Sequence, residues 1–133
     1  MQPLPVVVFP DAEQLVIDYL AGVLGSGVAV GAELPEDVQA AVPVVAVSLL
    51  DTDEVLDFVL EDPVLDVEVL AADKASASDL ARLVSAHMKV LPSIPVSGAQ
   101  VYEVERQGLA WLPDDVTDLP RYVLTFRLRV RPA

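Results

Sequence analysis

Residues 120–131 alternate between apolar and polar side chains, and this pattern constrains the chain more than any other stretch. One side of an extended backbone carries Tyr122, Leu124, Phe126, Leu128 and Val130. The other side carries Val123, Thr125, Arg127, Arg129 and Arg131. Alternation with a period of two is typical of a strand that buries one face in a core. Pro120 and Pro132 bracket the run, so we predict a strand between them.

A second alternating stretch, residues 64–71, has a complementary pattern. Its apolar side chains point one way, while Asp66 and Glu68 point the other way. If the two strands are neighbours, these acids face Arg127 and Arg129 across the ladder. The four C-terminal arginines then form either a solvated strand face or part of an interface; they are Arg121, Arg127, Arg129 and Arg131.

The other predicted elements follow from apolar spacing and capping residues. Asp11 and Gln14 have the spacing of a capping box at the start of a helix that ends near residue 25. A second helix lies within residues 73–91, with Asp73, Ser76 and Ser78 as candidate caps. Strands are expected at 28–34, 42–49 and 100–112. The sum is one domain, 1–133, with an extended arm at 1–10. We predict an α+β fold with a mostly antiparallel sheet of four to five strands and two helices on one face.

Residues 51–63 are rich in acids and are predicted to form a solvated, mobile loop. Asp51–Thr52–Asp53 is similar to the start of a calcium-binding loop. Leu56 and Asp62 stand where such a loop needs glycine and a bidentate glutamate. The sequence therefore favours a loop without calcium.

Composition excludes several classes of function. The net charge is −13, which argues against a reader of nucleic-acid sequence. There is no cysteine, so an intracellular origin is expected. The longest uncharged run, residues 19–32, is shorter than the about 20 residues of a membrane span. We find no metal-ligand spacing, no cofactor motif and no catalytic constellation. The single histidine, His87, is either a catalytic base or ligand, or a buried or interface histidine.

Apolar residues make up 53% of the chain, and the mean hydropathy is +0.49. Both values are high for a small protein, and they favour apolar surface buried against copies of the chain or against a partner. All 21 acids precede residue 121, whereas four of the eight bases lie at residue 121 or after it. An acidic body and a basic last strand can pair head-to-tail between subunits.

Several short motifs, in order along the chain, resemble those of the tail terminator (minor tail or tail-completion) proteins of long-tailed phages that infect actinobacteria. The motifs are Phe9–Pro10–Asp11, Glu33–Leu34–Pro35, Pro43–Val44–Val45, Asp66–Val67–Glu68–Val69, Asp79–Leu80–Ala81, Trp111–Leu112–Pro113–Asp114, Pro120–Arg121–Tyr122–Val123 and Leu128–Arg129–Val130–Arg131. In place of residues 51–63 the family usually has a glycine-rich loop.

The resemblance implies a structural virion protein without catalysis, made in the host cytoplasm. Terminators form a hexameric ring that caps the tail tube and joins it to the head–neck connector. The implied partners are copies of the chain, the tail tube protein and a head-closure protein, and DNA passes through the bore without sequence-specific binding. An acidic bore repels DNA and lets it slide.

Two alternatives remain at this point. One is another neck component, either a head-closure or an adaptor protein. The other is a small acidic enzyme or ligand-binding module. The candidate interface residues are Arg121, Arg127, Arg129, Arg131, Asp66, Glu68 and Trp111. Trp111 fits either an anchor in the core or at a sheet edge, or an interface hot spot.

Overall fold

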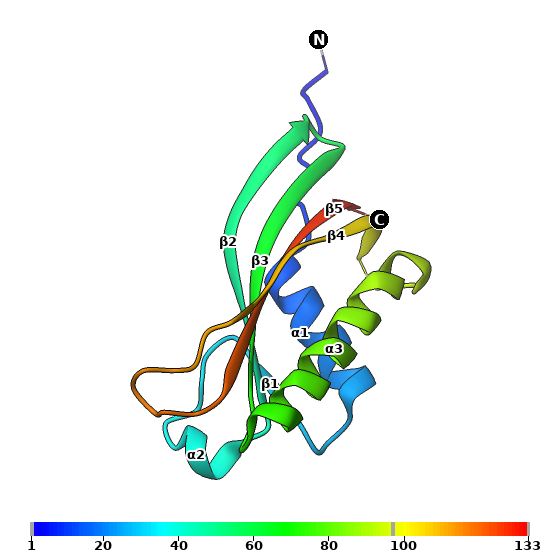
Figure 1. Cartoon of the computed structure of the whole chain (residues 1–133). Coiled ribbons are helices and arrows are strands. Elements are labelled where there is room, and N and C mark those ends of the chain that lie inside the picture. Colours follow the sequence, from blue (N-terminus) through cyan, green and yellow to red (C-terminus); the bar gives the residue numbers. More distant parts are fainter. Residues whose placement is uncertain (1, 97, 133) are drawn as a thin grey trace.

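The last strand of the chain lies inside the sheet, with another strand on each side of it (Figure 1). The computed structural model describes residues 2–96 and 98–132. Its elements are α1 (Ala12–Leu24), β1 (Ala29–Gly31), α2 (Val38–Ala41), β2 (Val44–Leu56), β3 (Leu60–Leu70), α3 (Lys74–Val90), the 3-10 turn η1 (Leu91–Ser93), β4 (Ala99–Trp111) and β5 (Arg121–Pro132). The strand order is β1-β2-β3-β5-β4. Only the β1–β2 pair is parallel among these neighbours. The predicted α+β fold is confirmed.

The predicted alternation of β5 is also confirmed. Leu124, Phe126, Leu128 and Val130 are at most 1% exposed. They pack under the two long helices with Val16 and Leu20 of α1 and Val84 and Met88 of α3. Burying a side chain of this size contributes about 1.5–3 kcal/mol relative to leaving it exposed. The helices α1 and α3 lie on the same face of the sheet (Figure 1).

Both long helices begin at the predicted caps. The carboxylate of Asp11 accepts a hydrogen bond from the Gln14 amide at 3.1 Å, and that of Asp73 accepts one from the Ser76 amide at 2.8 Å. The reciprocal half of the predicted capping box does not form. The side chain of Gln14 instead donates to Asp18 at 2.8 Å, one turn further along α1.

A smaller apolar cluster covers the other face of the sheet at one end. Val38 of α2, Val44 of β2 and Leu70 of β3 form it, with Leu119 packed against them. Residues 44–47 of β2 are therefore buried on both faces. This second cluster explains why that stretch is almost continuously apolar.

The prediction of a loop at 51–63 is wrong. β2 continues to Leu56, β3 starts at Leu60, and the two strands form a long hairpin that projects past the helices (Figure 1). The ladder shifts register between Leu49 and Asp51 and again between Glu54 and Leu56. Each shift inserts one extra residue, so the period-two pattern of the sequence is interrupted twice. This interruption hides the strands from a sequence reading.

None of the helices in the described ranges, 2–96 and 98–132, is both long enough and apolar enough to cross a membrane.

Candidate functional site

The face of the sheet away from α1 and α3 carries a cluster of charged side chains centred on Asp62. Arg129 donates two hydrogen bonds, from Nε and Nη2, to the two carboxylate oxygens of Asp62, both at 2.9 Å. Arg127 adds a third hydrogen bond at 2.9 Å. The side chain of Asp62 is 3% exposed, whereas those of Arg127 and Arg129 are 41% and 33% exposed. A buried carboxylate is thus held by two guanidinium groups at the surface.

These contacts shift the pKa values of Asp62 and Arg129. The Arg129 hydrogen bonds are the main cause that holds the pKa of the Asp62 carboxyl below its usual value, and Arg127 adds to this effect. Burial alone opposes the shift, because a buried carboxylate prefers its neutral form. The pKa of Arg129 is raised in turn, chiefly by its hydrogen bonds to Asp62.

The predicted neighbours β3 and β5 do pair, but the predicted ion pairs are wrong. The register places Asp66 opposite Thr125 and Glu68 opposite Val123. Asp66 consequently accepts a hydrogen bond from the Thr125 hydroxyl at 2.7 Å. Glu68 forms its ion pair with Arg121 at 2.9 Å. The partner of Arg127 and Arg129 is Asp62, which the sequence reading had assigned to the loop.

Arg121 links the start of β5 to the connection that precedes it. Its Nε donates to the Leu112 carbonyl at 2.8 Å, and its Nη1 lies 3.7 Å from Asp114. The Thr117 hydroxyl bonds the same Asp114 carboxylate and is the main cause that lowers the pKa of Asp114. Arg121 is therefore committed to contacts within its own chain.

Arg131 and Trp111 lie at opposite ends of the β4–β5 pair. The guanidinium of Arg131 is exposed and lies 5.7 Å from the Tyr102 ring. The Trp111 ring is tilted against Tyr122, with 5.1 Å between ring centres. The Lys74 ammonium lies 4.4 Å above Trp111. Trp111 thus joins α3 to the end of the sheet, and it is still 39% exposed.

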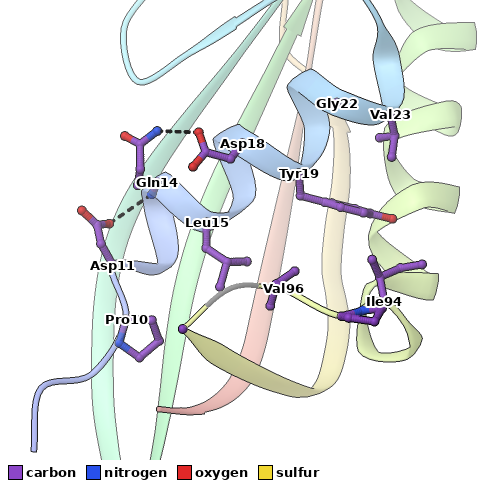
Figure 2. Close-up of a pocket in the computed structure, with 12 residues that line it drawn as sticks. Pro10, Asp11, Gln14, Leu15, Asp18, Tyr19, Gly22, Val23, Ile94 and Val96 are labelled. Carbon is purple, nitrogen blue, oxygen red and sulfur yellow. Dashed lines mark hydrogen bonds between the residues drawn. The ribbon is translucent and has the colours of Figure 1, made fainter. Parts of the chain in front are cut away.

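A groove of about 670 Å³ runs between α1 and the segment that follows η1 (Figure 2). Its floor and walls are apolar and include Leu15, Tyr19 and Val96. The Tyr19 hydroxyl donates to the backbone carbonyl of His87 at 2.7 Å and ties α1 to α3. The polar rim of Asp11, Gln14 and Asp18 is hydrogen-bonded within itself, as the dashed lines in Figure 2 show.

The groove has the shape of a binding site but few of the groups that an active site uses. His87 is not among its lining residues. Within residues 2–96 and 98–132, no group of three or more His, Asp or Glu side chains could hold a metal ion. The groove suits an apolar side chain or segment.

Exposed apolar side chains concentrate on the β2–β3 hairpin and on the arm. Six of them line the hairpin; they are Leu49, Leu50, Val55, Leu56, Phe58 and Val59. Phe58 is 47% exposed and occupies the turn with a φ of 66°. In the arm, Leu4, Val6 and Val8 are 76%, 93% and 79% exposed. Sequence reasoning missed the hairpin surface because it assigned residues 51–63, which include Val55, Leu56, Phe58 and Val59, to a solvated loop.

The fold has a counterpart among solved structures. A chain in the structure titled "Virion of native gene transfer agent (GTA) particle" matches with a TM-score of 0.56 and 21% sequence identity. The match covers 91% of this chain and 94% of that chain. No family model matches this chain. No curated protein matches it either. At this identity the likeness shows a shared fold over nearly the whole length of both chains.

Proposed function

We propose that this chain is a structural protein of a phage-like particle and that it acts as the tail terminator. In this role it forms a ring that caps the tail tube and joins it to the head–neck connector. The observation that carries the proposal is the fold shared, over nearly its full length, with a chain of a gene transfer agent virion. The order of the tail-terminator motifs in the sequence supports the same role.

The distribution of apolar surface supports assembly with other proteins. The hairpin and the arm project from the body and carry nine large exposed apolar residues between them. Apolar surface of this kind in a soluble particle marks a contact with a partner. A ring needs a heterologous contact, in which two different patches of the same chain meet. We assign the hairpin and the arm to this contact between subunits and to the contact with the tail tube protein.

The turn of the hairpin is occupied by Phe58, whose backbone conformation supports a role in contact with a partner. A non-glycine residue with a positive φ is strained, and Phe is a poor choice for that position. Glycine or asparagine would fit the turn better. A strained, exposed aromatic ring at the tip of a projecting hairpin is consistent with a side chain that is retained for contact with a partner.

The charged sheet face suits a surface past which DNA moves. Arg121, Arg127 and Arg129 are each bonded to a carboxylate of the same chain. Guanidinium groups held in this way are less available to phosphates, and the chain as a whole carries −13. Because the arginines are engaged within the chain, their assignment as the main subunit interface is less favoured than the hairpin and the arm.

The proposal is tested by cryo-electron microscopy of the protein mixed with tail tubes of its own particle. We expect a ring at one end of each tube and tubes of uniform length. The variant Phe58→Ser/Val59→Ser should lose the ring. The matched control is Val116→Ser, because Val116 is 91% exposed but lies in the connection before β5.

The alternative roles are outcomes of the same experiment. Tubes that ignore the wild-type protein, together with binding to isolated head connectors, would identify a head-closure or adaptor protein. If the protein bound neither, the groove between α1 and the segment that follows η1 would become the leading site, and a ligand-binding function would replace the structural one.

A further inference from the structure

The arm, residues 2–10, is extended and uncharged, and one of its faces is unpartnered. Leu4, Val6 and Val8 alternate along it and are all largely exposed, whereas Val7 and Phe9 are partly buried. In the part of the chain that the structure describes, the arm belongs to no strand of the sheet. An exposed extended segment with free amides and carbonyls can pair with the edge of a sheet.

The positions of Pro3 and Pro5 make one edge of the arm better suited to pairing than the other. In an extended chain, the N–H and C=O groups of alternate residues point to the same edge. Leu4, Val6 and Val8 share one edge, and each of them has an N–H. Pro3 and Pro5 fall on the opposite edge and have none. The arm is therefore suited to add to a sheet edge without offering an equally good edge to the next chain.

The distal half of β2 offers a free edge of matching length. β1 pairs only with Val44, Val45 and Ala46, so residues 48–56 of β2 have no strand beside them on that side in the described part of the chain. Side-chain carboxylates bond two amides of this segment instead. The Leu49 amide donates to Glu13 at 2.8 Å, and the Thr52 amide donates to Asp51 at 2.9 Å. Side chains of this kind can give way to the carbonyls of an added strand.

The edge of β4 is a poorer receptor for the arm. Its beginning packs against η1, and its middle carries the charged side chains of Glu103, Glu105 and Arg106. Charges on an edge strand oppose the addition of an apolar strand. The β2 segment also carries acids, but it exposes Leu49, Leu50, Val55 and Leu56 beside them. An uncharged arm adds no like charge to this acidic edge.

We propose that the arm of one copy of this chain adds as a strand to the free edge of β2 in a second copy. This inference rests on the self-association that the proposed function requires. Backbone hydrogen bonds along Leu4, Val6 and Val8 provide the pairing, and their side chains cover the exposed apolar residues of the neighbouring hairpin. The contact is heterologous, because the arm and the β2 edge are different surfaces.

The first test is disulfide cross-linking, which is clean because the natural sequence has no cysteine. Differently tagged chains carrying Val8→Cys or Leu50→Cys are mixed at the highest soluble concentration and oxidised. We expect a mixed disulfide dimer. A mixture of Val8→Cys and Val116→Cys chains should give a yield of mixed dimer at least about tenfold lower, because only random collisions join those two positions. Because each chain carries only one cysteine, every mixed disulfide joins two different copies of the chain.

The second test uses proline and depends on the two edges of the arm. In the Val8→Cys chain, Val6→Pro removes an N–H from the pairing edge, whereas Val7→Pro removes one from the opposite edge. We expect Val6→Pro to lower the yield of the cross-link to Leu50→Cys by roughly tenfold. Val7→Pro should leave it within about twofold. Both substitutions lie in the arm outside the sheet, so we expect the rest of the chain to fold normally in both variants.

Each other outcome overturns the inference. Equal effects of Val6→Pro and Val7→Pro would show that no strand ladder forms. A disulfide that forms only within a chain carrying both cysteines would place the arm on its own hairpin. Efficient cross-linking to Gln107→Cys, on β4, would assign the other edge. A ring at the tube end that survives Val6→Pro would reject the arm contact and leave the terminator role standing.

Discussion

Arg129 holds Asp62 through two parallel hydrogen bonds, both 2.9 Å long, although 67 residues separate the two in the chain. Because Arg127 adds a third bond, the carboxylate sits between two guanidinium groups that both belong to β5. This contact fixes the end of β3 that lies near the tip of the hairpin against β5. A contact of this kind, with one buried partner, has measurable consequences for stability.

Asp62→Asn should destabilise the fold by about 2 kcal/mol at neutral pH, because two arginines lose their anion while remaining partly solvated. The pKa of Asp62 is lowered in the folded state. The stabilisation is therefore fully present above the unfolded pKa, near 4, and is lost as the pH falls through the folded pKa. Urea unfolding from pH 7 to pH 2 measures the difference in free energy of unfolding between the wild type and Asp62→Asn. This difference should become smaller below about pH 4. A constant difference would contradict the assignment.

Charge reversal distinguishes the bonded arginines from Arg131. Arg129→Glu places a second carboxylate against Asp62 and should lower the melting temperature more than Asp62→Asn does. Arg131→Glu is the matched control, since Arg131 is exposed and faces Tyr102. It should change the melting temperature little. Equal effects of the two reversals in calorimetry would mean that the Asp62 cluster contributes no stability beyond general surface charge.

Phe58→Asn should make the isolated protein more stable by about 0.5–1 kcal/mol, because asparagine tolerates the positive φ of this turn better than Phe does. The same substitution should weaken assembly on tail tubes, since it removes an exposed aromatic ring. Thermal unfolding and tube capping measure the two effects separately. A loss of stability would show that the Phe58 ring packs usefully against its own hairpin.

Tyr19→Phe should lower the free energy of unfolding by about 1 kcal/mol, because it removes the hydroxyl that donates a hydrogen bond to the His87 carbonyl and so links α1 to α3. Burial also raises the pKa of Tyr19, so folding opposes its ionisation. The wild type should therefore lose stability as the pH rises through about 10, and the variant should lose less. Tyr102→Phe is the control, since Tyr102 is 42% exposed. Similar losses for both variants would refute the role of the Tyr19 bond.

The sequence was sufficient to predict those elements that depend on local pattern. The β5 strand, both long helices and the caps at Asp11 and Asp73 follow from periodicity and capping chemistry within a few residues. The hairpin could not be predicted in this way, because the extra residues in the ladder near Leu50 and Val55 interrupt its alternation. A residue that is out of phase by one appears to change faces, so a strand with two such shifts has no period to detect.

The ion pairs of the charged cluster could not be predicted for a different reason. The complementary patterns of β3 and β5 correctly predicted that they are neighbours, but not the register between them. An offset of a few residues decides whether Arg127 meets Glu68 or Asp62, and nothing within either strand specifies this offset. Register depends on packing of the whole sheet, which a single sequence does not show.

The position of β5 between β3 and β4 has a consequence for synthesis. Of the five strands, β5 leaves the ribosome last. Until it emerges, β3 lacks its second neighbour and β4 has no strand partner in the described sheet. The sheet therefore cannot close before β5 has emerged, and until then a nascent chain exposes an apolar half-core. A chain truncated before β5 should thus be recognised by chaperones or proteases and should not compete with finished subunits.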